Sequence, residues 1–249
     1  MDAERFVTCL AADEARLREA AADALGAVVP TCPEWTVSDL VEHVALVYLH
    51  KVECMRTGPP AGWPPPLDPE PPLALLDRAY EALVGEFAAR APGSASFTWY
   101  EPDQTVGFWA RRMAQETAIH RVDAELAVGV PVTPIPDDLA ADGIDEVLAR
   151  FLAYGSTRRP GDFGAGLSEA DGSTVLVAAD DRAWLVRMEP TGVVVAPADP
   201  GAPASARVGG DPHGVLLWLW RRTDAAAITY EGDPAALCRL RDLLGTATR

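Results

Sequence analysis

The chain has 249 residues, of which 49% are hydrophobic, and a formal net charge of −16 at pH 7. This length suits one large domain or two ordinary ones, with ample apolar material for a core. The acidic balance argues against a nucleic-acid-binding protein, which needs a basic surface, and against attraction to membrane head groups.

The N-terminus predicts no secretory signal, because it is acidic and runs directly into an amphipathic helix. The longest apolar run near the C-terminus, Val215 to Trp220, is far too short to span a bilayer. We therefore expect a cytoplasmic protein with no membrane and no nucleic-acid partner.

The first part of the chain has helical periodicity interrupted by proline-rich breaks. Thr36 precedes a helix with Asp39 three residues later, close to a capping box. Residues 28–35 and the proline-rich residues 59–72 are predicted to be irregular, and residues 97–104 extended. The expected helices cover residues 3–25, 36–57, 72–91, 106–128 and 137–154. Four or five long helices with polar residues among them predict a helix bundle, assigned to residues 1–155.

The pattern changes after Gly155 to short β-rich runs separated by turn residues. A helix beginning near Asp211 contains the apolar run noted above, and a closing amphipathic helix covers residues 233–244. The predicted strands cover residues 173–179, 183–189, 192–196 and 226–230. The fold class is therefore α+β, with a helix bundle and a smaller C-terminal domain over residues 156–249.

Three ionisable side chains lie on faces that should be apolar. Glu116 and His120 are four residues apart, so in a helix they lie on one face, within a core-facing stripe. His43 occupies the inward face of its own helix. Buried ionisable groups need a partner, and a cation would serve. Two imidazoles and one carboxylate suit a catalytic zinc with a fourth position open, although nickel, iron(II) or manganese would also accept this set.

Neighbouring residues add candidates and alternatives. Asp123, one turn after His120, can accept a hydrogen bond from it and fix its tautomer. Asp39 precedes His43 by one turn but is better explained as a helix cap. His50, two turns after His43, could replace it as a ligand, and a histidine on an apolar face is often only a hydrogen-bonded core residue.

The cysteines show no metal-binding or catalytic pattern. No C-x-x-C pair occurs, so the four residues are expected to be free thiols, most of them packed as small hydrophobic groups. They are Cys9, Cys32, Cys54 and Cys238.

Three segments of the chain strongly resemble one known family. They are C-P-E-W-T-V-S-D-L-V-E-H-V-A (residues 32–45), R-R-M-A-Q-E-T-A-I-H-R-V-D-A-E (111–125) and V-G-G-D-P-H-G-V-L-L-W-L-W-R-R (208–222). Together they resemble the mycothiol-dependent maleylpyruvate isomerase family over essentially the whole chain. The resemblance implies a DinB-type four-helix bundle followed by a small α/β domain similar to sterol-carrier proteins.

The resemblance also implies roles for particular residues. The zinc ligands of the family fall on His43, Glu116 and His120, the set that helical spacing also indicates. A catalytic arginine of the family falls on Arg222, with Arg221 as the neighbour it could be confused with. The family often has a glycine where this chain has Arg221, and that departure weakens the assignment of Arg222.

The function implied is a zinc-dependent enzyme that activates a low-molecular-weight thiol, mycothiol, for attack on an electrophilic small molecule. A carboxylate-bearing electrophile fits this expectation. The enzyme would be a cis–trans isomerase or a thiol S-transferase, and the ligand set does not choose between them. Two alternatives stay open at this point. One is a zinc hydrolase using bound water, with Asp123 as base. The other is a non-enzymatic ligand-binding protein with a structural metal.

Overall fold

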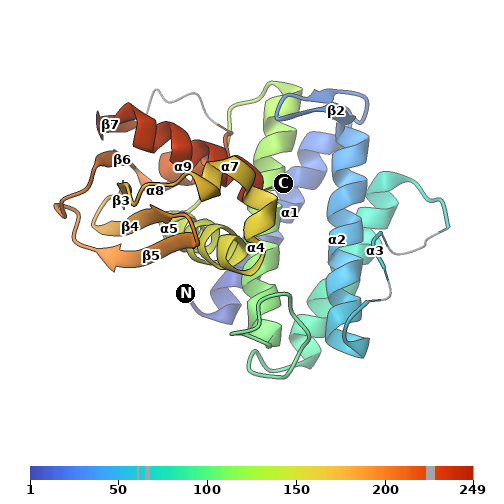
Figure 1. The fold of residues 1–249 in the computed structure, drawn as a ribbon. Coiled ribbons are helices and arrows are strands. Elements are labelled where there is room, and N and C mark those ends of the chain that lie inside the picture. Colours follow the sequence, from blue (N-terminus) through green and yellow to red (C-terminus); the bar gives the residue numbers. More distant parts are fainter. Residues whose placement is uncertain (61, 65–67, 223–227, 249) are drawn as a thin grey trace. The chain divides into compact units, whose positions relative to one another are not determined.

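The computed structural model describes residues 1–60, 62–64, 68–222 and 228–248, which form two compact units (Figure 1). The units are Met1–Thr133 and Pro134–Arg249. The boundary predicted after residue 155 therefore lies inside the second unit. The helix starting at Asp137 packs on elements that follow it in the second unit.

The first unit contains four long helices. They are α1 (Ala3–Ala21), α2 (Val37–Thr57), α3 (Pro72–Ala89) and α4 (Val106–Val128). Helix α1 packs mainly on α4, α2 packs mainly on α3, and α2 also contacts α4. The four helices predicted over residues 3–25, 36–57, 72–91 and 106–128 are observed nearly in full. Helix α1 ends earlier than the alanine-rich sequence indicates.

Local sequence explains where these helices begin and end. The Thr36 hydroxyl accepts a hydrogen bond from the Asp39 N–H, and the Asp39 carboxylate accepts from the Thr36 N–H, which completes a capping box. Thr105 caps α4 in the same way, with its hydroxyl accepting from the Phe108 N–H. Helix α4 ends at Gly129, whose φ of 72° is the left-handed conformation that glycine adopts readily.

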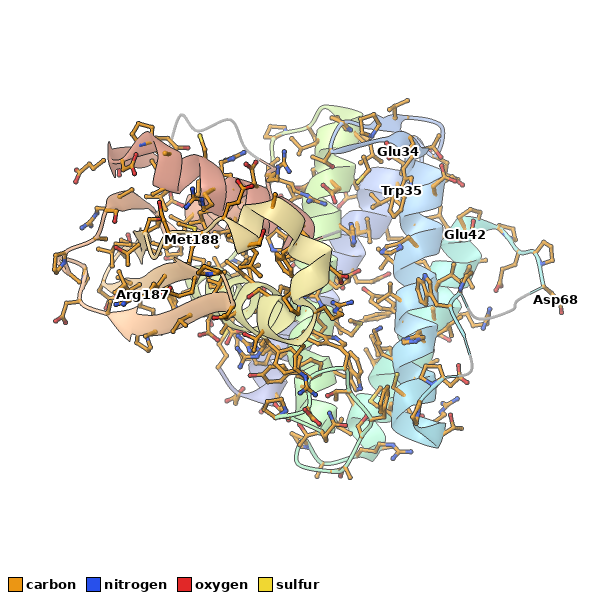
Figure 2. All side chains as sticks on the ribbon, viewed as in Figure 1. Glu34, Trp35, Glu42, Asp68, Arg187 and Met188 are labelled. Atoms are coloured by element: carbon orange, nitrogen blue, oxygen red, sulfur yellow. The ribbon has the colours of Figure 1, made fainter. Side chains whose placement is uncertain are left out.

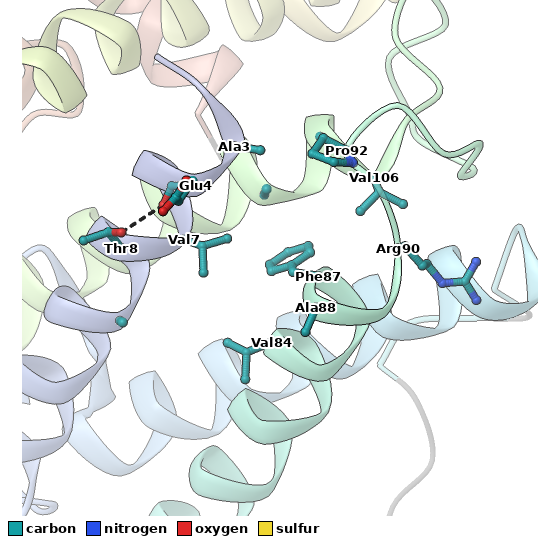
Figure 3. Close-up of a pocket in the computed structure, with 13 residues that line it drawn as sticks. Ala3, Glu4, Val7, Thr8, Val84, Phe87, Ala88, Arg90, Pro92 and Val106 are labelled. Atoms are coloured by element: carbon teal, nitrogen blue, oxygen red, sulfur yellow. Dashed lines mark hydrogen bonds between the residues drawn. The ribbon is translucent and has the colours of Figure 1, made fainter.

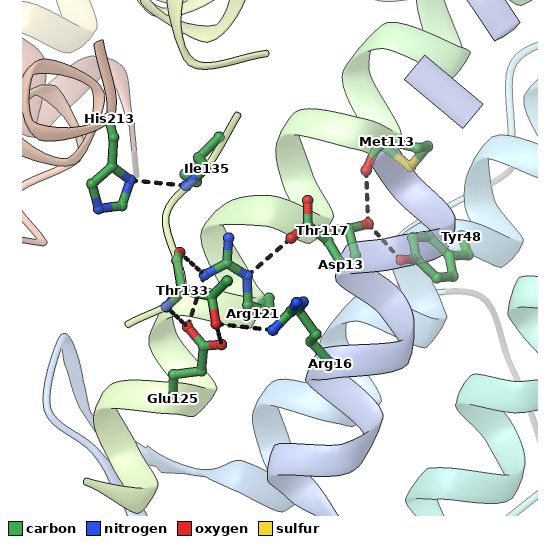
Figure 4. Close-up of polar contacts among 10 residues, drawn as sticks. All are labelled: Asp13, Arg16, Tyr48, Met113, Thr117, Arg121, Glu125, Thr133, Ile135 and His213. Atoms are coloured by element: carbon green, nitrogen blue, oxygen red, sulfur yellow. Dashed lines mark hydrogen bonds and ion pairs between the residues drawn. The ribbon is translucent and has the colours of Figure 1, made fainter. Parts of the chain in front are cut away.

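Helix α4 is the most buried element of the first unit. Of its residues, 17 are buried, including several charged ones. Arg121 is fully buried and donates hydrogen bonds to Asp13 on α1 at 3.0 Å, to Glu125 at 2.7 Å and to the Thr133 carbonyl at 2.6 Å (Figure 4). These contacts pair the buried Arg121 charge with two carboxylates and tie α4 to α1.

A short antiparallel sheet precedes α2, where the sequence predicts only a loop. Strand β1 (Val28–Val29) pairs with β2 (Cys32–Thr36). The prolines in this stretch suppress the strand signal, and β1 is too short to show one of its own. The sheet lies directly before α2 in the chain.

The second unit combines helices with one five-stranded sheet. Its first helix, α5 (Asp137–Asp145), continues through a π-helical stretch (Glu146–Tyr154) into α6 (Gly155–Arg158). After a 3₁₀ turn (Pro160–Phe163) and α7 (Gly164–Ser168), the strands are β3 (Thr174–Ala179), β4 (Arg182–Glu189), β5 (Gly192–Ala198), β6 (Ala206–Gly210) and β7 (Thr229–Gly232). Helix α8 (Pro212–Leu219) lies between β6 and β7 in the chain, and α9 (Pro234–Ala247) closes it. The fold class is α+β, as predicted.

The sheet has the order β5-β4-β3-β6-β7, in which only β3 and β6 are parallel. Strand β6 was not predicted, because its sequence A-R-V-G-G has two glycines and a single β-branched residue. The strand predicted over residues 226–230 is observed as β7, starting at Thr229, while residues 226 and 227 lie outside the described part. No described helix is long and apolar enough to cross a membrane.

Candidate metal site in the helical unit

The structure brings His43, Glu116 and His120 together between α2 and α4. Nε2 of His43 lies 3.4 Å from Oε1 of Glu116, and Nε2 of His120 lies 3.2 Å from the same oxygen. The ring centroids of the two histidines are 5.1 Å apart. All three ligand atoms lie within 4.8 Å of one another, and no other such group occurs among the described residues.

This spacing fits a small tetrahedral cation. Two ligands each about 2.0–2.1 Å from a tetrahedral zinc are separated by roughly 3.3–3.4 Å. The two nitrogen–oxygen distances match that separation. The side chains keep 28% (His43), 13% (Glu116) and 12% (His120) of their exposure, so the ligand atoms are not sealed from solvent. A set of three protein ligands with some solvent access is typical of a catalytic site, and four ligands are typical of a structural one.

Charges around the cluster keep Glu116 ionised. Burial alone would raise the pKa of Glu116, but the Arg112 guanidinium and the two histidines outweigh it and hold that pKa well below its usual value. Burial would lower the pKa of His120, but Glu116 and Asp123 raise it to about 9. Without an ion, the carboxylate is thus balanced by an imidazolium, and a divalent cation would take over that role.

Asp123 orients His120. Its Oδ2 lies 3.0 Å from Nδ1 of His120, which leaves Nε2 directed at Glu116. Its Oδ1 accepts a hydrogen bond of 2.6 Å from the hydroxyl of Thr31, in the turn between β1 and β2. The Asp123 side chain is fully buried and engaged at both oxygens. It is therefore poorly placed to act as the general base that the hydrolase alternative needs.

Three neighbours of the cluster were not predicted. Arg112, one turn before Glu116 on α4, donates to Glu116 Oε2, so the carboxylate presents Oε1 to the histidines. Trp35, labelled in Figure 2 beside α2, lies 4.9 Å from the His43 ring. Trp63 lies 6.2 Å from it on another side. The i,i+4 spacing to Glu116 could have indicated Arg112, whereas no sequence signal identifies the two tryptophans.

The alternative ligand His50 is not part of the cluster. Its Nδ1 lies 2.9 Å from Nζ of Lys51 and 3.8 Å from Sγ of Cys54. Asp39 contacts Thr36 as a helix cap, as described above. The described cysteines are free thiols, as predicted, and none belongs to the cluster.

The two arginines near residue 222 lie in the second unit. Arg222 follows α8, where Nη1 donates to the Trp220 carbonyl at 2.8 Å and the guanidinium lies 5.6 Å from the Trp220 ring. The Arg221 guanidinium instead lies against Gly245 of α9. Arg221 has a φ of 62°, the left-handed region that favours glycine. This explains why a glycine is expected there, and the role of Arg222 stays a prediction.

The first unit also has an apolar cavity of about 730 Å³ between α1, α3 and the start of α4 (Figure 3). Val7, Val84, Phe87 and Val106 line it, with Glu4 and Arg90 as its charged members. None of the three clustered ligands lines it. It is a feature separate from the candidate metal site.

These features define an α+β protein whose helical unit carries a cluster of two histidines and one glutamate. Residues 7–125 match the model of the mycothiol maleylpyruvate isomerase N-terminal domain, and residues 138–239 match that of the corresponding (MDMPI) C-terminal domain. The two matches together span most of the chain. The chain belongs to the mycothiol-dependent maleylpyruvate isomerase family.

Solved structures agree with this assignment at the level of the fold. The crystal structure of the mycothiol-dependent maleylpyruvate isomerase is 15% identical, with 93% of each chain covered and a TM-score of 0.61. A histidine-to-alanine mutant of that isomerase is 14% identical over the same shares, with a TM-score of 0.59. The ubiquinone synthesis protein UbiJ-SCP2 is 17% identical, and the match covers 47% of this chain and 93% of the UbiJ-SCP2 chain. Its TM-score of 0.29 is too low to support the predicted likeness to sterol-carrier proteins. No curated protein sequence matches the chain.

Proposed function

We propose that this protein is a zinc-dependent enzyme that uses a low-molecular-weight thiol, mycothiol, to attack an electrophilic small molecule. The observation that carries the proposal is the convergence of His43, Glu116 and His120, with both histidine Nε2 atoms at the distance from Glu116 Oε1 that tetrahedral ligands would have. The family assignment supplies the thiol. The proposed location is the cytoplasm.

The residues of the chain would hold and orient the metal in defined ways. His43 and His120 offer Nε2, and Glu116 offers Oε1. Asp123 fixes the tautomer of His120, and Arg112 fixes the rotamer of Glu116. A divalent ion bound there would supply Lewis acidity that lowers the pKa of a coordinated thiol.

The chemistry of the thiol then accounts for either reaction of the family. The sulfur forms a bond to one carbon of a conjugated double bond, and the π electrons move onto the adjacent carbonyl. Rotation about the resulting single bond, followed by expulsion of the thiol, gives the trans isomer. In an S-transferase the carbon–sulfur bond is kept. Because both routes share the same nucleophile, we propose the thiol-activating step for this chain without choosing between them.

The metal content of the purified protein, measured by elemental mass spectrometry, tests this proposal. We expect about one zinc per chain, lost in His43→Ala and His120→Ala. His50→Ala serves as the matched control and should keep the metal, because His50 contacts Lys51 and not the cluster. Thiol added to the cobalt-substituted protein should produce a thiolate-to-cobalt absorption band.

Metal content that is indifferent to His120, or cobalt protein that is indifferent to thiol, would overturn the proposal. Loss of metal in His50→Ala but not in His43→Ala would instead show that the wrong histidine of α2 had been assigned. A hydrolase would be indicated by turnover without thiol.

A further inference from the structure

Lys51 is the one lysine of the chain and lies on the side of α2 that faces α4. Its Nζ is 5.0 Å from the Trp109 ring of α4 and 6.0 Å from the Trp63 ring. Trp63 is also a neighbour of the candidate ligand His43, at 6.2 Å between ring centroids. The same indole therefore lies beside both the candidate metal site and the lysine.

The Lys51 ammonium has no carboxylate partner among the described residues, although the chain has 37 acidic residues. An ammonium offers three donors. One of them is directed at Nδ1 of His50, 2.9 Å away. Burial and Lys51 lower the pKa of His50 to about 4, so its ring is neutral at pH 7 and can accept this bond. The other donors have the Trp109 and Trp63 rings nearby, and no carboxylate among the described residues forms an ion pair with Nζ, although Glu116 attracts it at longer range.

An ammonium that contacts aromatic rings and forms no ion pair has an explanation that needs no ligand, namely cation–π contact. That contact does not offset the burial, because burial lowers the pKa of Lys51 to about 8. Lys51 as a whole residue is half-buried, so it is not sealed from solvent. An anion at this point would form the ion pair that Lys51 lacks among the described residues and would use the remaining donors.

Position along the helix links Lys51 to the candidate site. His43 and Lys51 are separated by roughly 12 Å along the axis of α2, given a rise of 1.5 Å per residue. Side chains of a helix tilt toward its N-terminus, and for Lys51 that direction leads toward His43. A small molecule can therefore have its acidic group at Lys51 and its electrophilic carbon nearer the clustered ligands.

We propose that the Lys51 ammonium binds a carboxylate of the electrophilic substrate, with Trp63 and Trp109 flanking that group. This inference rests on the proposed function for the identity of the substrate as an electrophile. It adds a binding residue that sets specificity for acidic over neutral electrophiles. No covalent step involves Lys51.

The single lysine permits a direct test. Expression with ¹³C-labelled lysine places the label at Lys51 alone and leaves all three N–H donors of the ammonium intact. The probe is maleate, a conjugated dicarboxylate, titrated without thiol into the labelled protein of known metal content. We expect the Lys51 resonance to shift to saturation with maleate, but not with dimethyl maleate or with sodium chloride of equal ionic strength.

Variants then separate charge from fold. In calorimetric titrations Lys51→Met should weaken maleate binding about tenfold or more, the loss expected for one charge-assisted hydrogen bond. Lys51→Arg, which keeps the charge, should retain most of the affinity. Arg18→Met removes an exposed positive charge of the same unit and should leave binding unchanged.

A Lys51 resonance that responds no more to maleate than to chloride, or unchanged affinity in Lys51→Met, would overturn the inference. The two proposals fail separately. Normal zinc content and a normal thiol–cobalt band with an unresponsive Lys51 would leave the proposed function intact. Maleate binding at Lys51 in a protein without metal or thiol chemistry would support the anion site and sink the thiol enzyme.

Discussion

Asp123→Asn isolates the charge of the residue that orients His120. Asparagine has the same shape, and its carbonyl can still accept from Nδ1 of His120, now 3.0 Å from Oδ2 of the aspartate. The amide can still meet the Thr31 hydroxyl, which donates to Asp123 in the native protein. The variant should therefore fold normally while removing a fully buried negative charge beside a candidate ligand.

The expected loss is 10- to 100-fold in zinc affinity, the usual effect of changing a group that hydrogen-bonds a metal-bound histidine. This corresponds to about 1.4–2.7 kcal/mol of binding free energy. The cause is that a neutral amide raises the basicity of the imidazole less than a carboxylate does. Competition for zinc against a chromophoric chelator at fixed pH would measure it.

Asp39→Asn is the matched control, because Asp39 precedes His43 by one turn and does not contact it. Its carboxylate accepts from the Thr36 backbone N–H at 2.7 Å and from the Thr36 hydroxyl at 2.6 Å. The control should cost about 1 kcal/mol of stability through the helix cap and leave zinc affinity unchanged. Equal zinc affinity in Asp123→Asn and the native protein, or an equal loss in both variants, would refute the reasoning.

Three further outcomes are expected. Arg121→Met should lower the free energy of unfolding by about 3–5 kcal/mol in urea titrations followed by circular dichroism, because it leaves buried Asp13 and Glu125 without their arginine partner. A loss below 1 kcal/mol would contradict the role given to that network. Burial would raise the pKa of Glu86, but ion pairs with Arg56 and Arg90 outweigh it and hold that pKa below its usual value. Glu86 therefore stabilises the fold above its unfolded pKa of about 4.3 and loses this effect as the pH falls. The free energy of unfolding of Glu86→Gln should then fall less steeply with pH below that value than it does in the native protein, and an equal slope would contradict the prediction. The ¹³Cε resonance of labelled Lys51 should titrate near pH 8, and a midpoint above 10 would show that the side chain is not desolvated.

Periodicity along the sequence was sufficient for the long helices, because each is set by local patterns of apolar residues, caps and prolines. Helix α4 begins and ends at the predicted residues, since Thr105 and Gly129 mark its ends. The Glu116–His120 pair follows from the same local geometry. Its juxtaposition with His43 could be predicted only because both faces were inward and a family pattern named the same residues.

What the sequence could not supply depends on contacts between distant segments. Trp63 lies near His43 but belongs to an irregular connector whose sequence has no periodicity. Residues 61 and 65–67 of that connector lie outside the described part of the chain. Strand β6 forms because β3 and β7 offer partners on both sides, despite its two glycines. Arg221 takes a left-handed conformation that its own side chain disfavours, so the α8 terminus imposes it.

The arrangement of the helices in pairs has a consequence for the rate at which a bound ion could leave. Helix α1 packs mainly on α4 and α2 mainly on α3, while the three candidate ligands come from α2 and α4 and so from different pairs. Release of an ion would then need at most a small separation of the two pairs and would not require either to unfold. Chelator-driven release should therefore be much faster than global unfolding, and metal should slow amide hydrogen exchange most in the turns of α2 and α4 that carry the ligands.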